Sequence, residues 1–217
     1  MPTFAEIIDP AHTAVITMEL QRGVTGDLAA MKALAAEVRE AGVIDNVRRL
    51  CAAARTAGGR VVHCTAAFRA DMAGATVNAR IIAASIKLNQ GRLNQGEPGV
   101  EVMPELDPQP SDIVLERLHG MTPFTSTPLD QMLRNMRVTT VVATGNSVNI
   151  GVLGLVLTAV DLGYQVVVPR DAVAGVPASY ADAVIDNTIA MLATVTTTDD
   201  LIAAWSSPSA GGSSPRG

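Results

Sequence analysis

The segment that most constrains the fold of this chain is residues 138–163, which read VTTVVATGNSVNIGVLGLVLTAVDLG. Residues 138–144 are β-branched and apolar, as in a strand buried within a parallel sheet, and an apolar helical pattern runs from Asn149 to Gly163. Where a helix follows a strand in this way, its first turn presents unpaired backbone N–H groups. We therefore expect a binding site at this turn, lined by Gly145, Asn146, Ser147 and Asn149.

The rest of the chain alternates between strand and helix patterns. Strands are predicted at residues 13–19, 61–65, 113–116, 165–169 and 193–197, and helices at residues 43–57, 79–88, 127–135 and 179–192. This order is typical of an α/β fold, a single-domain, doubly wound and mostly parallel six-stranded sheet with helices on both faces. The domain is expected over residues 1–205, followed by a Ser/Gly/Pro-rich tail at residues 206–217.

Composition argues against several classes of function. The 217 residues are 48% hydrophobic and carry a net charge of −5 without basic clusters, so neither nucleic acid nor a membrane is an expected partner. The sequence shows no signal pattern and no stretch near the roughly 20 apolar residues of a membrane span, which predicts a cytoplasmic protein. Cys51 and Cys64 are expected to be buried free thiols, with a reactive Cys64 as the alternative.

Three polar features fall at the carboxyl ends of predicted strands, where doubly wound sheets bind their ligands. The first strand ends in Glu19, the third runs into Arg117, and the fourth leads into the turn at residues 146–151. Taken singly, each could be a solvated strand end, a surface charge or one half of an ion pair. Together they predict a pocket at this edge.

Gly151 occupies the part of the first helical turn where many α/β hydrolases hold a nucleophile. A glycine can donate its N–H group and admit a ligand close to the backbone, but it has no side-chain atom that can attack. Tight helix packing is the alternative reason for a glycine at this position.

Four segments of the chain resemble the isochorismatase-like hydrolase family, which includes nicotinamidases and N-carbamoylsarcosine amidohydrolases. They read TAVITMELQRG, ARTAGGRVVH, PGVEVMPELDPQPSDIVLERLHGMTPFTSTPLDQML and VTTVVATGNSVNIGVLGLVLTAVDLGYQVVVPRDAVAG. The resemblance implies an aspartate after strand one, a lysine after strand three and a cysteine nucleophile after strand four. By position these fall on Glu19, Arg117 and Gly151, so all three differ and no covalent adduct can form at position 151.

A glycine in place of the cysteine is the feature of the true isochorismatases, a branch of this family that cleaves a vinyl ether without a protein nucleophile. Resemblance to that branch implies that Glu19 is the general acid and that Arg117 binds a substrate carboxylate or stabilises developing charge. The branch itself has aspartate and lysine at these positions, so another small carboxylate or an amide, with Glu19 as the base for water, stays open. A further alternative is a catalytically silent member that binds a small ligand or serves in an assembly, which a bidentate Glu19–Arg117 pair would favour.

The resemblance also bears on the surroundings of the site. It implies an unusual cis peptide bond near Asn146–Ser147 and assembly as a homo-oligomer, a dimer or a tetramer. Further candidates for the pocket lining follow the second, third and fourth strands: Phe68, Arg69, His119, Phe124 and Ile150.

No cofactor and no metal site are expected. Nicotinamidases of the family bind a metal through an aspartate and histidines, whereas Asp27, His63 and Asp71 here show no such spacing. His63 is instead expected to be a core residue within the second strand. The expected partner is a small-molecule substrate or ligand.

Overall fold

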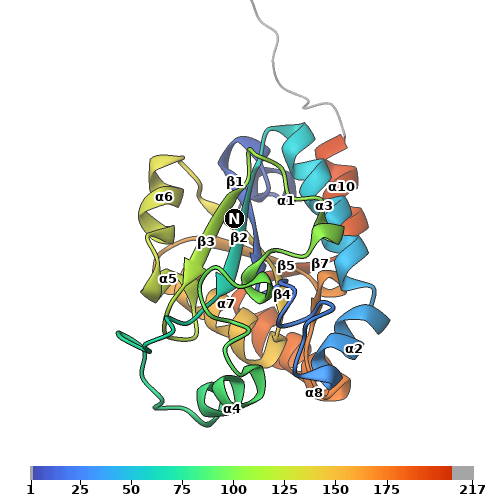
Figure 1. Ribbon diagram of the computed structural model, residues 1–217. Coiled ribbons are helices and arrows are strands. Elements are labelled where there is room, and N and C mark those ends of the chain that lie inside the picture. Colours follow the sequence, from blue (N-terminus) through green and yellow to red (C-terminus); the bar gives the residue numbers. More distant parts are fainter. Residues whose placement is uncertain (1, 207–217) are drawn as a thin grey trace, which may run out of the picture.

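The computed structural model describes residues 2–206 of the chain. One sheet runs in the order β3-β2-β1-β4-β5-β7, and the two-residue strand β6 pairs with the end of β4. Every strand pairing among these residues is parallel (Figure 1). The predicted α/β class with a mostly parallel six-stranded sheet is therefore confirmed, with β6 as an addition. The strands are β1 (Thr13–Met18), β2 (Arg60–Ala66), β3 (Ile113–Arg117), β4 (Thr140–Asn146), β5 (Gln165–Pro169), β6 (Val173–Ala174) and β7 (Thr194–Thr196).

Side chains of the central strands alternate between two hydrophobic cores, one on each face of the sheet. Ile16 and Val141 belong to one core, whereas their neighbours Val15 and Val142 belong to the other, because successive strand residues point to opposite faces. Burial on both faces accounts for the continuous β-branched runs that predicted these strands.

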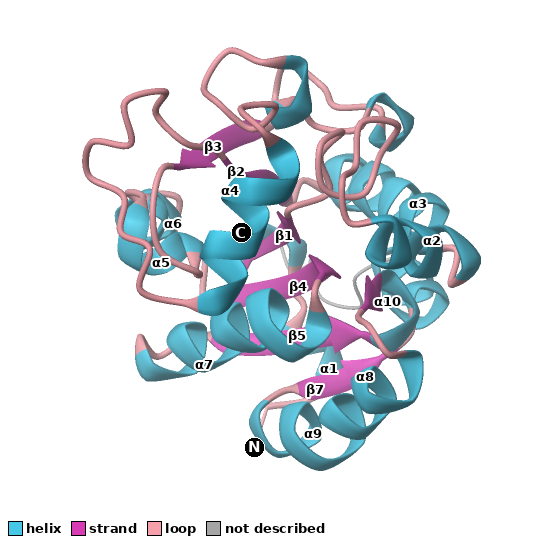
Figure 2. Ribbon diagram, turned by 60° about the horizontal axis from the view of Figure 1, so that its bottom comes forward, coloured by secondary structure: helices cyan, strands magenta, loops and turns pink. Residues whose placement is uncertain are grey.

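Helices cover both faces of the sheet (Figure 2). The first face carries α5 (Pro123–Ser126), α6 (Leu129–Asn135), α7 (Leu153–Asp161), α8 (Ala178–Val184) and α9 (Ala190–Leu192). The second carries α1 (Phe4–Ile7), α2 (Lys32–Glu40), α3 (Val43–Ala57) and α10 (Thr198–Ser206). The remaining helix, α4 (Arg80–Asn89), buries only Asn89 and helps to line a pocket at the carboxyl ends of the strands.

Most predicted elements are present, with shifted ends. The helix at residues 43–57 and the strand at 165–169 match α3 and β5 residue for residue. Strand β1 ends at Met18 and not at Glu19, because Glu19 has a left-handed backbone with φ of 52°. Strand β4 extends to Asn146, two residues beyond the prediction, because β6 pairs with its end.

Three features differ more strongly from the sequence prediction. Helix α2 was not predicted; it has Met31 at its N-cap and hence no side-chain capping signal. Helix α10 reaches Ser206, the first residue of the predicted tail, and the rest of that tail lies outside the described residues. The helices after β4 and β6 contain π-helical turns, at Val148–Val152 and Ile185–Ile189, where continuous helices were expected.

The direction of winding reverses between β1 and β4, which are neighbours in the sheet. Gly145 and Met18 are paired at the ends of these strands. Gly145 has φ of 103°, and a Cβ atom there would lie 2.3 Å from the Met18 carbonyl oxygen, so this close approach requires glycine. The switch point thus brings the residues after β1 and β4 into contact.

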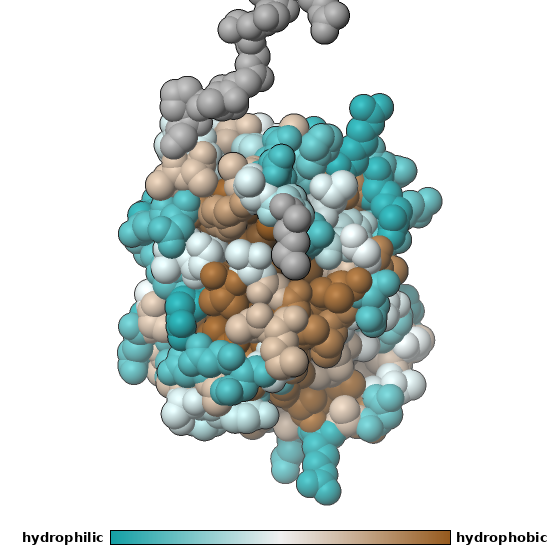
Figure 3. Space-filling view, turned by 180° about the vertical axis from the view of Figure 1, so that it is seen from behind, coloured by the Kyte–Doolittle hydropathy of each residue, from teal (hydrophilic) through white to brown (hydrophobic). Residues whose placement is uncertain are grey.

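The described surface includes exposed apolar side chains, among them Leu157 and Val160 of α7 and Met191 of α9. Figure 3 shows apolar residues gathered near the middle of the face opposite to that of Figure 1. Assembly through such a face stays a prediction. Within residues 2–206, no helix combines the length and the apolar character that crossing a bilayer requires.

Candidate functional site

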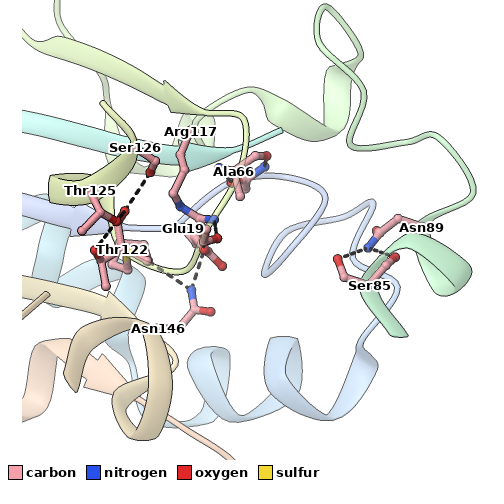
Figure 4. Close-up of polar contacts among 12 residues, drawn as sticks. Glu19, Ala66, Ser85, Asn89, Arg117, Thr122, Thr125, Ser126 and Asn146 are labelled. Carbon is pink, nitrogen blue, oxygen red and sulfur yellow. Dashed lines mark hydrogen bonds and ion pairs between the residues drawn. The ribbon is translucent and has the colours of Figure 1, made fainter. Parts of the chain in front are cut away.

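A pocket opens at the carboxyl ends of β1 to β4, where the sheet rule predicts a ligand site. It encloses a cavity of about 100 Å³. Its polar side is formed by residues that end these strands, closely follow them or begin the helix after β4, namely Glu19, Arg117, His119, Asn146, Ser147 and Gly151 (Figure 4 labels three of them).

Glu19 and Arg117 form an ion pair on the polar side of the pocket. Arg117 donates from Nη2 to Oε1 of Glu19 and from Nη1 to the carbonyl oxygen of Gly120. The other carboxylate oxygen of Glu19 has no partner among the described residues, and it points away from Arg117 in Figure 4. The pair therefore has one contact and is not bidentate. The Arg117 side chain is 9% exposed and that of Glu19 22%, so the free oxygen belongs to the more accessible partner.

Asn146 holds the backbone at Glu19 in place. Its Nδ2 donates to the carbonyl oxygens of Glu19, at 3.0 Å, and of Met18, at 3.3 Å. These two acceptors fix the amide orientation, which leaves Oδ1 buried and without a partner among the described residues. The peptide bond between Asn146 and Ser147 is cis, at the position that the family resemblance implied.

Gly151 lies in the π-helical turn Val148–Val152 and lines the pocket. A Cβ atom at this position would lie 3.1 Å from the Asn146 carbonyl oxygen and 3.1 Å from Cε of Met18. Both distances are shorter than ordinary contacts, so the space that a side chain would need is already partly filled. Gly151 therefore both permits tight packing and leaves this position without a nucleophile.

An apolar wall faces the polar side of the pocket. It is built from the loops after β1 and β2, from α2 and from α4, which lies across from Glu19 in Figure 4. Sequence reasoning missed most of this wall, because its members are ordinary hydrophobic residues brought together by irregular segments. We name Val24, Met31, Leu34, Phe68, Ile81, Ile82 and Leu93 the apolar wall.

The structure brings most of the predicted site residues to this pocket: Glu19, Phe68, Arg117, His119, Asn146, Ser147, Ile150 and Gly151. Four predicted residues do not line it. Gly145 lies within β4, where it pairs with Met18. Arg69 forms an exposed ion pair with Asp71 at 2.7 Å, and Phe124 packs against Tyr164 with ring centroids 5.7 Å apart. Asn149 lies one shell away, where its side-chain oxygen accepts a hydrogen bond from the Ser147 hydroxyl.

A second acid–arginine cluster lies away from the pocket, between α3 and the start of β3. Asp112 accepts hydrogen bonds from Nε and Nη2 of Arg55, at 2.9 and 2.7 Å, and from the Gln109 backbone N–H at 2.8 Å. His63 completes the cluster; its Nε2 lies 3.3 Å from Asp112 and its Nδ1 lies 2.8 Å from the Thr17 hydroxyl. Because a carboxylate only accepts, Nε2 carries the proton and Nδ1 accepts from Thr17.

The prediction for His63 is confirmed, since it lies in β2, is fully buried and makes hydrogen bonds through both ring nitrogens. Burial lowers the pKa of His63, and the hydrogen bond to Asp112 offsets this only in part. Burial alone would raise the pKa of Asp112, but the Arg55 guanidinium and the Gln109 N–H hold it below its ordinary value.

Both cysteines are free and buried, as predicted. Burial raises the pKa of Cys51 and that of Cys64 to about 12, so neither thiol is activated as a nucleophile. No three His, Cys, Asp or Glu side chains between residues 2 and 206 are arranged to hold a metal ion.

Comparison with known proteins identifies the family. The model of the isochorismatase domain matches residues 13–200 of the chain. The chain belongs to the isochorismatase family. This family assignment covers all of the strands and the complete pocket.

Solved structures of isochorismatase relatives agree with this assignment. A cysteine hydrolase from Pseudomonas syringae pv. phaseolicola 1448A superposes with a TM-score of 0.77 at 26% identity, covering 92% of this chain and 94% of the other. An isochorismatase family protein from Burkholderia thailandensis gives 0.73 at 25% identity, covering 91% and 97%. The N-carbamoylsarcosine amidase of Thermoplasma acidophilum gives 0.66 at 25% identity, covering 86% and 96%.

Proposed function

We propose that this chain is an isochorismatase-family hydrolase of the branch without a cysteine nucleophile, acting on a small carboxylate or enol-ether type substrate by acid–base catalysis through Glu19. One observation carries the proposal. The Glu19 carboxylate has a free oxygen on the pocket, beside Gly151, whose position offers no attacking atom. Proton transfer by Glu19 is therefore the chemistry that the pocket can supply, because position 151 has no nucleophile.

Glu19 supports two directions of proton transfer. For an enol ether, the protonated side chain donates to the terminal carbon of the double bond, and water adds to the resulting oxocarbenium ion before the C–O bond to the leaving alcohol breaks. For an amide or ester, the carboxylate takes a proton from the attacking water. Arg117 positions the Glu19 side chain in either case, because it contacts Oε1 and leaves the second oxygen free.

The test is a hydrolysis screen of the purified chain against two panels, small amides and enol ethers including isochorismate. With an active substrate, Glu19→Gln is expected to lower kcat/KM by about 100-fold or more, the usual contribution of a general acid or base. Glu97→Gln is the matched control, because the same change is made at an exposed residue outside the pocket. An unchanged rate in Glu19→Gln, or silence on both panels, contradicts the proposal.

The second candidate is a catalytically silent member that binds a small ligand. The Glu19–Arg117 ion pair favours it, because a paired carboxylate is partly neutralised. The single contact of that pair argues against it, since a locked pair would use both oxygens. Silence on both panels together with saturable ligand binding would establish this second function.

A further inference from the structure

We propose that the ligand of this pocket has an uncharged, hydrogen-bond-donating end on an apolar body, and that it carries no carboxylate group. This inference rests on the proposed function in taking the pocket at Glu19 as the working site. Of the substrates given above, it keeps the uncharged enol ethers and amides and excludes the small carboxylates. Three features of the pocket support it: the charge of the polar side, the kind of hydrogen bond that this side offers, and the apolar wall.

The cation that a substrate carboxylate would need is already paired. Arg117 is the only lysine or arginine among the described residues that line the pocket, and each of its terminal nitrogens already makes one hydrogen bond, to Glu19 and to the Gly120 carbonyl oxygen. A ligand carboxylate that reached the remaining N–H groups of Arg117 would lie beside the negative charge of Glu19. Like charges at such short range disfavour each other strongly where water is scarce.

The polar side instead presents an acceptor. The second oxygen of Glu19, which lines the pocket, has no partner in the described part of the chain. Asn146 offers no side-chain donor, because its Nδ2 is held by the carbonyl oxygens of Met18 and Glu19, and its Oδ1, turned away from Glu19 in Figure 4, is buried. An N–H or O–H group on the ligand satisfies the free Glu19 oxygen, whereas a carboxylate leaves it unpaired at a cost.

The apolar wall selects for a hydrophobic body. Helix α4 contributes Ile81 and Ile82, and Leu34 comes from α2. Ile81 is 36% exposed, so ligand binding would cover apolar surface that water now contacts. Burying apolar surface is favourable in proportion to its area, and each ligand methylene in contact with such a wall strengthens binding several-fold.

Equilibrium titration calorimetry with three small probes tests the proposal. Isovaleramide combines an uncharged donor with an apolar body, isovalerate replaces only the amide by a carboxylate, and acetamide removes most of the apolar body. We expect isovaleramide to bind at least about tenfold more tightly than either comparison probe. Equal or tighter binding of isovalerate or acetamide, or no saturable binding of isovaleramide, overturns the proposal.

Two variants test the two ends of the pocket separately. Glu19→Gln releases the Arg117 guanidinium, so the preference is expected to reverse, with isovalerate gaining about tenfold in affinity relative to isovaleramide.

Ile81→Gln is expected to weaken the binding of isovaleramide about tenfold and to leave the binding of acetamide unchanged. Leu88→Gln is the matched control on α4, because Leu88 is 46% exposed and does not line the pocket. An unreversed preference in Glu19→Gln, or equal losses in Ile81→Gln and Leu88→Gln, refutes the argument.

These binding measurements fail independently of the hydrolysis screen. A chain that hydrolyses nothing but prefers isovaleramide refutes the proposed function and keeps this inference. A chain that hydrolyses a member of either panel but prefers isovalerate keeps the proposed function and refutes this inference.

Discussion

Two pairs of a carboxylate and an arginine lie at different places on the same sheet, one at the carboxyl ends of the strands and one between α3 and the start of β3, and they are built differently. Asp112, whose side chain is 2% exposed, accepts both bonds of the Arg55 fork, a backbone N–H and the His63 ring. Glu19, at 22%, makes one contact with Arg117 and leaves an oxygen free on a pocket. The residue types are alike, but the carboxylate oxygens of Asp112 are filled with hydrogen-bond donors, whereas one oxygen of Glu19 has none.

This difference distinguishes an ion pair that stabilises the fold from one that is a candidate for catalysis. A buried carboxylate needs every acceptor position filled to offset the loss of its water, and Asp112 meets that requirement. A group that transfers a proton needs an open position for its substrate, and Glu19 has one. Exchanging or removing members of the Arg55–Asp112 pair should therefore change stability, and doing so in the Glu19–Arg117 pair should change activity.

The largest effect on stability is expected from Asp112→Asn. The substitution removes the charge that compensates Arg55 and the acceptor of the His63 ring, so the free energy of unfolding should fall by about 3 kcal/mol. Urea denaturation followed by circular dichroism measures this. Asp107→Asn serves as the control, because only the backbone carbonyl of Asp107 contacts Arg55. A loss below about 1 kcal/mol would remove the distinction between the two pairs.

Glu19→Gln should show the opposite pattern. Its effect on turnover, about 100-fold, corresponds to about 2.7 kcal/mol of transition-state stabilisation, while the free energy of unfolding should change by less than about 1 kcal/mol. The small stability effect follows because the Gln amide oxygen can still accept from Arg117, which also keeps its contact with the Gly120 carbonyl oxygen. The same urea denaturation experiment measures the stability of this variant. A loss as large as that of Asp112→Asn would mean that Glu19 is a structural residue.

The cluster of Arg55, His63 and Asp112 should also make the free energy of unfolding depend on pH. Because burial lowers the pKa of His63 below its ordinary value of 6.5, the unfolded chain binds a proton more readily than the folded one. Stability is therefore highest above that value and falls as the pH drops below it, by at most about 1.4 kcal/mol per pH unit.

Denaturation at a series of pH values measures this dependence for the whole chain. His63→Gln should flatten the profile between neutral and mildly acidic pH. The contribution of Asp112, whose pKa is also lowered, disappears only below its ordinary value of 3.8. An unchanged pH profile in His63→Gln would contradict the conclusion that the His63 ring is buried in its neutral form.

The smallest effects are expected from exchanging arginine for lysine. Arg55→Lys loses the two-bond fork to Asp112 and should cost about 1 kcal/mol of stability. Arg117→Lys keeps the contact with Glu19 possible and loses the one to the Gly120 carbonyl oxygen, so it should cost less, about 0.5 kcal/mol. Parallel thermal melts compare the two variants. Equal losses would indicate that the Arg117 pair is also held as a fork.

The sequence was sufficient to predict the order of the elements and the strand ends that form the pocket. The continuous β-branched runs mark buried parallel strands, and the switch-point rule then brings Glu19, Arg117 and the turn at Asn146 together. The apolar wall could not be found in this way, because Leu34 and Ile81 belong to helices or loops whose packing is decided only in three dimensions. The second cluster was missed for the same reason; Asp112 follows a Pro-rich loop and carries no motif.

Met18 gives the close packing at Gly151 a further consequence. Cε of Met18 and the Asn146 carbonyl oxygen both lie 3.1 Å from where a Cβ at position 151 would be, so a side chain there needs these neighbours to give way by a few tenths of an ångström. Cε is the far end of a flexible side chain and yields easily, whereas the carbonyl belongs to the backbone. Substitutions at positions 18 and 151 are therefore expected to be non-additive in their effect on stability.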